Sequence, residues 1–256
     1  MLRDEVFTRP RGAEVRLVLA KEMLMLKKAL FLAALLPIYL TSVAQAQDLS
    51  ADEVLQNLED RSASLQDAYF LLTGTIYDSD SQQYALEVDV QFIPDQELAR
   101  ADIYQPDALA DNFIIADGKT VYNYLFVTNQ VTILSADDPQ ALGALLPEEQ
   151  GAVNLTPDLG RFFKSDNWKP TLEGYEESDD GPVYKLRFDN LDESANLDYV
   201  DATVLDSEWL PQSMTFVQTD GSPLAELNFS DYELDTGIDP TALREIPADA
   251  ERIDER

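Results

Sequence analysis

Apolar and polar positions alternate along most of residues 68–234, and this period of two predicts β-strands. The alternation is clearest at 83–93, where apolar residues at 86, 88, 90 and 92 are separated by Glu87, Asp89 and Gln91. Such a strand has one buried and one solvated face. The segments that we predict to be strands are 68–78, 83–93, 97–104, 112–116, 119–127, 130–134, 171–176, 182–189, 197–206, 211–219 and 223–234.

A helix precedes the strands. Ser50 is an N-cap residue and Glu53 follows three positions later, which is the pattern of a capping box. The apolar stripe of this helix, at helical spacing, comprises Val54, Leu55, Leu58 and Leu65. Between strands, the dipeptides Asp117-Gly118 and Asp220-Gly221 predict tight turns.

Two parts of the chain depart from the strand pattern. Segments 139–146 and 155–163 are interrupted by Pro, Gly and Asp, and they predict short helices or loops in an insertion at about 137–165. Residues 238–256 are polar and contain Pro240 and Pro247, so we expect an appended loop there.

The predicted fold class is mainly β with helices (α+β), with ten or eleven antiparallel strands, an N-terminal helix and a helical insertion. A barrel of about eight strands is filled by its own side chains, whereas a larger one encloses space. A sheet of this size that curls on itself therefore needs a helix, a lid or a ligand inside it. We expect the apolar residues of 142–146 and 155–163 to fill this interior.

Residues 23–46 have the three parts of a cleavable signal peptide. Lys27-Lys28 is the basic part, 29–43 is the apolar part, and the small residues Ala44 and Ala46 predict cleavage before Gln47. The alternative is a membrane anchor, but the apolar run is short for a bilayer core of ~30 Å and contains Pro37. Residues 1–22 place acidic side chains ahead of the signal, so we expect a mis-assigned upstream extension and translation from position 23 or 25. One domain, 47–256, would follow.

The missing residue types exclude several chemistries. The chain has no His and no Cys, so it has no imidazole base, no Ser-His-Asp triad, no thiolate nucleophile and no cysteine to carry a lipid. We expect no cofactor and no metal. Two acidic turns, 78–80 and 189–193, are predicted to be solvated, with weak Ca²⁺ binding as the alternative. A carboxylate pair of the glycosidase type stays open, but nothing in the pattern selects two residues.

The net charge limits the classes of molecule that this protein can bind. Removing seven basic and four acidic residues with 1–46 leaves 11 Lys or Arg and 45 Asp or Glu, a net charge of −34. Phosphate binding needs clustered basic residues, so nucleic acid is excluded as a partner. Close docking on an anionic lipid surface is disfavoured, and we expect a soluble, self-repelling monomer.

Residues 105–131, QPDALADNFIIADGKTVYNYLFVTNQV, resemble the signature region of periplasmic lipoprotein carriers of the LolA type. The residues that carry the resemblance include Gln105, Pro106, Asp107, Asp117, Gly118 and Lys119. Regulators of the RseB type and lipid carriers of the LppX type share the pattern. The resemblance implies an unclosed antiparallel β-barrel with a helical lid, which binds acyl chains and is not an enzyme. Proteobacterial carriers have a basic residue where this chain has Pro94-Asp95-Gln96, and Arg100 is the nearest base.

The resemblance and the strand parity together select candidate lipid-binding residues. They are Leu86, Val88, Val90, Phe92, Ile103, Phe113, Ile115, Tyr122, Tyr124, Phe126, Met214, Phe216, Leu227 and Phe229 on strands, and Leu142, Leu145, Leu146, Phe162 and Phe163 in the lid. Ordinary core packing is the alternative for each. In 121–127 the parity is ambiguous, because Val121, Leu125 and Val127 form a rival apolar face.

Three functions fit these observations. The first is a carrier that binds lipoprotein acyl chains or other lipid and moves them between envelope membranes, with membrane-bound donor and acceptor proteins as partners. The second is a sensor or regulatory module of the RseB type, which binds a protein partner. The third is an envelope hydrolase that uses carboxylates.

Overall fold

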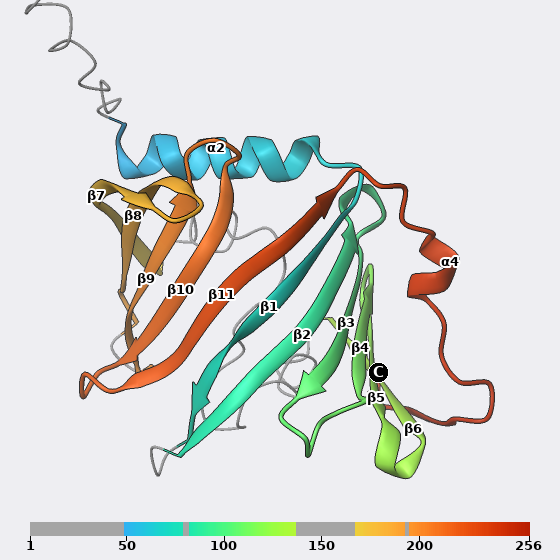
Figure 1. The fold of residues 1–256 in the computed structure, drawn as a ribbon. Helices are drawn as coiled ribbons and strands as arrows, with labels where there is room; N and C mark the ends of the chain where they lie inside the picture. The colour runs from blue at the N-terminus through green and yellow to red at the C-terminus, as the bar shows by residue number, and fades with distance from the viewer. Residues whose placement is uncertain (1–48, 79–81, 137–166, 193–194) are drawn as a thin grey trace, which may run out of the picture. The chain divides into compact units, whose positions relative to one another are not determined.

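The computed structural model describes residues 49–78, 82–136, 167–192 and 195–256, which lie in one compact unit from Leu49 to Arg256 (Figure 1). Several predictions fall outside these residues. They are the upstream extension 1–22, the signal peptide 23–46 with Ala44 and Ala46, and the lid insertion 137–165 with Leu142, Leu145, Leu146, Phe162 and Phe163.

The predicted N-terminal helix is α2, Ala51–Ser64, and its capping box is confirmed. The Glu53 amide donates to Ser50 Oγ at 3.3 Å, and the Ser50 amide donates to Glu53 Oε2 at 2.7 Å. The second bond stabilises the carboxylate and lowers the pKa of Glu53. The predicted stripe is buried, because Val54, Leu55 and Leu58 of the helix and Leu65 just after it all belong to the main core.

Twelve strands form a single sheet in the order β12-β6-β5-β4-β3-β2-β1-β11-β10-β9-β8-β7. All neighbours are antiparallel except β12 and β6, and the sheet is not closed, because β12 and β7 are its two edges. The predicted unclosed, mainly β fold is therefore confirmed. The strands are β1 Ala68–Tyr77, β2 Gln83–Ile93, β3 Leu98–Gln105, β4 Phe113–Asp117, β5 Thr120–Leu125, β6 Gln130–Ser135, β7 Trp168–Ser178, β8 Gly181–Asn190, β9 Leu197–Leu205, β10 Leu210–Gln218, β11 Pro223–Leu234 and β12 Glu251–Asp254.

The expectation of an appended loop at 238–256 is wrong. This tail contains the short helix α4, Pro240–Leu243, and the strand β12, which pairs in parallel with β6 from Glu251↔Gln130 to Asp254↔Ile133. The sequence misses β12 because a strand of four residues with one apolar side chain has almost no period-two pattern. Its partner lies about 120 residues earlier in the chain, so only the tertiary structure supplies the pairing.

The predicted strand 119–127 also ends early, at Leu125. Phe126–Thr128 form the 3₁₀ turn η3, and Asn129 follows in the left-handed conformation with a φ of 49°. The buried Asn112 holds this turn, because its Oδ1 accepts from the Phe126 amide at 2.8 Å. A similar 3₁₀ turn, η2 at Pro94–Gln96, joins β2 to β3.

The pairing of β1 with β11 joins the two halves of the sheet, because all strands from β1 to β6 lie on one side of it and all from β7 to β11 on the other. Gly74 lies within this pairing, opposite Leu227. A Cβ at Gly74 would overlap the backbone oxygen of Glu226. The close approach of the two strands therefore requires glycine at this position.

Asp67 fastens the start of β1 to the segment that follows β11. Its carboxylate is 5% exposed and accepts from the amides of Thr236 and Gly237 at 2.9 Å and of Ile238 at 3.3 Å. The Asp67 carbonyl also accepts from the Asp235 amide. Burial of a carboxylate is stable only when such donors surround it, so Asp67 fixes where the C-terminal tail leaves the sheet.

Gly74→Ala should lower the free energy of unfolding by about 2–3 kcal/mol, because an added methyl group must push β1 and β11 apart. Gly174→Ala in β7 is the matched control, since nothing lies within 4 Å of its added Cβ. We expect this control to change stability by less than about 1 kcal/mol, in the stabilising direction. Urea denaturation measures both, and equal midpoints for Gly74→Ala and the wild type would contradict the close approach.

Candidate functional site

Apolar side chains form two separate clusters on opposite faces of the sheet. In β4, Ile114 belongs to the larger cluster, whereas Phe113 and Ile115 belong to the smaller one. Successive strand residues point to opposite faces, so the two clusters cannot share one wall. We call the face with Ile114, on which α2 packs, the inner face, and the face with Phe113 the outer face.

The inner face is the candidate functional site. It is apolar from β8 across β9, β10, β11 and β1 to β2, and α2 contributes its buried stripe to the same cluster. Nine of the candidate residues lie here: Leu86, Val88, Val90, Phe92, Ile103, Met214, Phe216, Leu227 and Phe229. The cross-strand pair Leu72↔Phe229 shows how the sheet register brings segments more than a hundred residues apart onto this face.

Sequence reasoning missed much of the inner face. The missed residues include Phe70, Leu72, Ile76, Ile114, Leu134, Tyr184, Leu186, Phe188, Val200 and Val204. A signal was present in 182–189, where Tyr184, Leu186 and Phe188 alternate with Lys185 and Arg187. That alternation has the same period as the one in β2, and it places all three on the inner face.

Half-buried side chains border the inner face, and most of them are large. Trp168, Leu172, Tyr175, Leu197, Trp209, Phe229 and Tyr232 are partly buried and pack against its cluster. Near the β9–β10 turn, Trp209 stacks on Tyr184 at 5.5 Å between ring centroids, and Tyr175 lies 4.9 Å from the same ring. Asp206 accepts from the Tyr175 hydroxyl at 2.9 Å. Burial and Asp206 raise the pKa of Tyr184 to about 12, so this aromatic group is uncharged at neutral pH.

The outer face holds four other candidates. Phe113, Ile115 and Tyr124 belong to the smaller cluster and Tyr122 packs against it, so the prediction that they share one wall with Leu86 and Val88 is wrong. In β5 it is Val121, from the alternative apolar face of 121–127, that lies on the inner face, because it belongs to the larger cluster. β4 has buried residues on both faces, and so does β5 with Val121 and Tyr124, so the apolar spacing does not fix the parity. Phe126 lies on neither face and is 54% exposed in η3.

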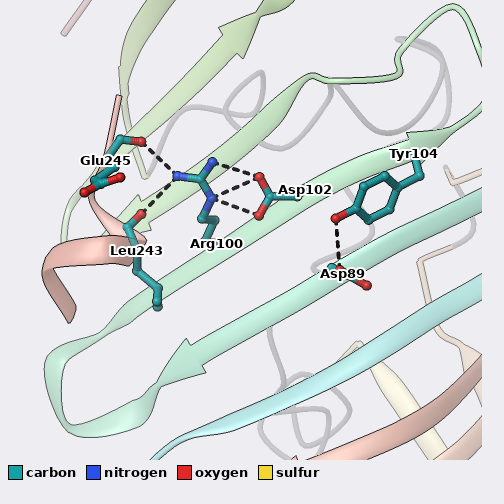
Figure 2. A network of polar contacts seen from close by, with 6 residues as sticks. All are labelled: Asp89, Arg100, Asp102, Tyr104, Leu243 and Glu245. Atoms are coloured by element: carbon teal, nitrogen blue, oxygen red, sulfur yellow. Dashed lines mark hydrogen bonds and ion pairs between the residues drawn. The ribbon is translucent and has the colours of Figure 1, made fainter. Parts of the chain in front are cut away.

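The C-terminal tail covers the outer cluster, with Leu243 buried in it and Ile238, Ile246 and Ala250 packed against it. Arg100 holds the tail in place (Figure 2). Its guanidinium forms a bidentate salt bridge with the Asp102 carboxylate, with both hydrogen bonds at 2.8 Å, and it donates to the Glu245 carbonyl at 2.8 Å. It also lies 4.1 Å from the centroid of the Phe113 ring. The Arg100 side chain therefore lies on the outer face and places no charge on the inner face.

The family-motif residues lie in turns and at strand ends. Gln105 ends β3, Pro106 and Asp107 begin the turn to β4, and Asp117, Gly118 and Lys119 form the β4–β5 turn. Gly118 has a φ of +60°, as a tight turn requires. Asp117 accepts from Arg244 Nε at 2.7 Å and Nη2 at 2.9 Å, and this pairing lowers the pKa of Asp117. The motif thus forms part of the attachment of the tail.

A polar network occupies the outer face beyond the tail. Asp89 accepts from the Tyr69 hydroxyl at 2.8 Å and from the Tyr104 hydroxyl at 3.0 Å, and Figure 2 shows the Tyr104 bond. Burial and the Asp89 carboxylate raise the pKa of Tyr69 to about 12. The two phenols therefore stay protonated and donate to one carboxylate, which is a structural arrangement with no free base.

Within the described residues, no group of three acidic side chains is placed to hold a metal ion. In the same part of the chain, no helix is long and apolar enough to cross a membrane. What the inner face offers is apolar contact area, aromatic rings and phenols. Such a wall suits a ligand made of hydrocarbon, since hydrocarbon has no hydrogen-bond pattern to match.

No protein-family model matches the sequence. No curated protein matches it either. The structure is similar to that of an uncharacterized conserved protein from Thermus thermophilus, with a TM-score of 0.59 and 20% identity over 80% of this chain and 98% of that one. It is also similar to MucB, with a TM-score of 0.50 and 11% identity over 79% of this chain and 65% of MucB.

A LolA superfamily protein from Nitrosomonas europaea also matches, with a TM-score of 0.41 and 15% identity over 77% of this chain and 98% of that one. At these identities the likeness concerns the fold alone. The unclosed, mainly antiparallel β-fold implied by the resemblance at residues 105–131 is confirmed.

The tail should loosen when Asp117 loses its charge. Its pKa is lowered in the folded protein, so the pair with Arg244 stabilises the tail above about pH 4 and this contribution is lost as the pH falls through the folded pKa. Asp117→Asn should produce the same loss at pH 6. We expect amide-exchange protection of Glu251 and Glu255, which donate to Asn129 and Ile133, to fall about two- to fivefold.

Asp254→Asn is the matched control, because the Asp254 carboxylate pairs with Arg256 within the tail and does not link the tail to β4. It should leave the protection of Glu251 unchanged at pH 6. If Asp117→Asn and the wild type lose the same protection between pH 4 and pH 2, the pair with Arg244 does not hold the tail.

Proposed function

We propose that this protein is an exported carrier that binds lipoprotein acyl chains or other lipid against the inner face and moves them between envelope membranes. The observation that carries the proposal is the continuous apolar surface from β8 to β2, which collects nine of the predicted lipid-binding residues and half-buried aromatic side chains at its border. Each methylene that leaves water contributes roughly 0.8 kcal/mol, so acyl chains would be held without any specific polar contact.

The proposal includes export and solubility. The signal at 23–46 and its cleavage after Ala46 are predictions from the sequence, and they would leave a chain with no cysteine to accept a lipid anchor. The acidic surface would keep a carrier with a large apolar interior soluble and monomeric. Membrane-bound donor and acceptor proteins are the partners that such a carrier needs.

The absence of His and Cys from the sequence favours a binding protein over an enzyme. Two phenol–carboxylate pairs of the described structure, Tyr69 with Asp89 and Tyr175 with Asp206, are each hydrogen-bonded within the pair and lie on different parts of the sheet. A regulatory module of the RseB type, which would bind a protein partner, is the second candidate, because the fold is also that of MucB.

Binding of a fluorescent fatty acid such as 11-(dansylamino)undecanoic acid, and its displacement by unlabelled palmitate, tests the proposal. Leu172→Ser should weaken binding about tenfold, because Leu172 is half-buried at the inner face opposite Leu186 and loses its apolar contact with the chain. Ile246→Ser is the matched control, since Ile246 is a half-buried aliphatic residue on the outer face.

The control should leave the dissociation constant unchanged while it costs similar stability. Purified protein that binds no acyl chain, but captures a membrane-anchored protein, would replace the carrier with the regulatory module. Equal weakening by both variants would show that binding follows stability and not the inner face.

A further inference from the structure

The exposed large apolar side chains in the described parts of the chain gather at one end of the sheet. They are Tyr84, Tyr104, Leu125, Phe126, Val127 and Leu191. Val127 is 86% exposed and Phe126 is 54% exposed, which is unusual for side chains of this kind in sequence neighbours. Solitary exposed apolar residues need no explanation, but a group confined to one end of a protein indicates a contact surface.

Strand direction places these residues together. β1 starts at the end where α2 joins the sheet and runs away from it, and neighbouring strands in the sheet, from β6 to β7, alternate in direction. Tyr84 therefore lies beside the far β1–β2 turn, Tyr104 at the far end of β3, residues 125–127 at the β5–β6 turn, and Leu191 just after β8. Figure 1 shows α2 at one end of the sheet and the β5–β6 turn at the other. We call this set of six residues the apolar rim.

Hydrogen bonds hold the most exposed part of the apolar rim in place. Asn112 Oδ1 accepts from the Phe126 amide at 2.8 Å, and the Asn129 amide donates to the Phe126 carbonyl at 3.1 Å. Asn129 also accepts from the Tyr124 hydroxyl at 3.1 Å and donates to the Asp249 carbonyl at 3.2 Å. The turn is thus braced from β4, β5 and the tail. Because the backbone of the turn is already ordered, binding through its apolar side chains costs little loop entropy.

Exposed carboxylates lie between the apolar positions, at Asp107 and Asp111 in the β3–β4 turn, at Asp192 and Asp198 around the β8–β9 turn, and at Asp220 in the β10–β11 turn. Among the described residues, the exposed bases at this end include Lys169, near the start of β7, and Arg252, near the start of β12. The carboxylates outnumber these two bases and would repel an anionic surface. They complement the ammonium groups of zwitterionic phospholipids, which carry the positive charge of those headgroups.

We infer that the apolar rim inserts into the headgroup region of a zwitterionic phospholipid bilayer. A pocket on a protein would accept the 125–127 turn alone, whereas the rim extends from β5 to β8 across the width of the sheet. A membrane surface accepts several separated side chains at once, and Tyr and Phe are residues that settle at such an interface. The inference rests on the proposed carrier function, since a lipid carrier must meet a membrane, and it assigns the end of the molecule that does so.

Flotation with vesicles tests the inference. The wild type should float with vesicles of phosphatidylcholine and phosphatidylethanolamine, and the double variant Phe126→Ser/Val127→Ser should bind them about tenfold more weakly. With phosphatidylglycerol vesicles the wild type should bind poorly at low salt and better at about 0.5 M NaCl, where the repulsion of the carboxylates is screened. The matched control is Gln96→Ser/Ala242→Ser, two exposed positions beside the β2–β3 turn at the opposite end.

The control should float like the wild type. The double variant should still bind the fluorescent fatty acid with unchanged affinity, because its substitutions lie away from the inner face. A wild type that does not bind the fluorescent fatty acid would instead refute the carrier function. Three results would overturn the membrane contact. They are a wild type that binds none of the vesicles, a double variant that binds them as well as the wild type does, and a wild type that binds phosphatidylglycerol vesicles more strongly at low salt than at high salt.

Discussion

The pairing of β1 with β11 is the interaction on which the rest of the structure depends. Every other antiparallel neighbour pair joins strands that follow each other in the chain, whereas β1 and β11 are separated by about 150 residues. Closing such a long loop costs conformational entropy, and the contacts between β1 and β11 must offset that cost. Gly74 permits the close approach of the two backbones, and the carboxylate of Asp67 fastens the ends beside α2.

This pairing also creates the inner face. Strands β8 to β11 present Tyr184, Val200, Met214 and Leu227, and strands β1 and β2 present Leu72 and Val88, which the register of β1 and β11 aligns into one apolar surface. The rings of Phe70 and Phe229 meet across it at 5.7 Å between centroids. Without the pairing, each half would be a meander with an unpartnered apolar side, and such a sheet is unstable in water.

The two faces of the sheet carry different chemistry. The inner face is hydrocarbon and aromatic, and the polar side chains of its border are paired with each other. On the outer face, charged residues either fasten the tail, as Arg100 and Arg244 do, or pair across strands, as Arg187 and Asp201 do at 2.7 Å. Charge is thereby kept away from the surface proposed to bind lipid, where an unpaired ion would oppose the entry of an acyl chain.

The sequence by itself determined α2, its capping box and eleven of the strands, because each depends on neighbours within a few residues. It also determined the inward parity of β2, where apolar and polar residues alternate without ambiguity. Tertiary structure alone decided the parity of β4 and β5, because each strand has buried apolar residues on both faces, one in the inner cluster and the other under the tail. The same applies to β12 and to the early end of β5. A four-residue strand is stabilised by a distant partner, and the turn after Leu125 is held by Asn112, so neither leaves a local pattern to read.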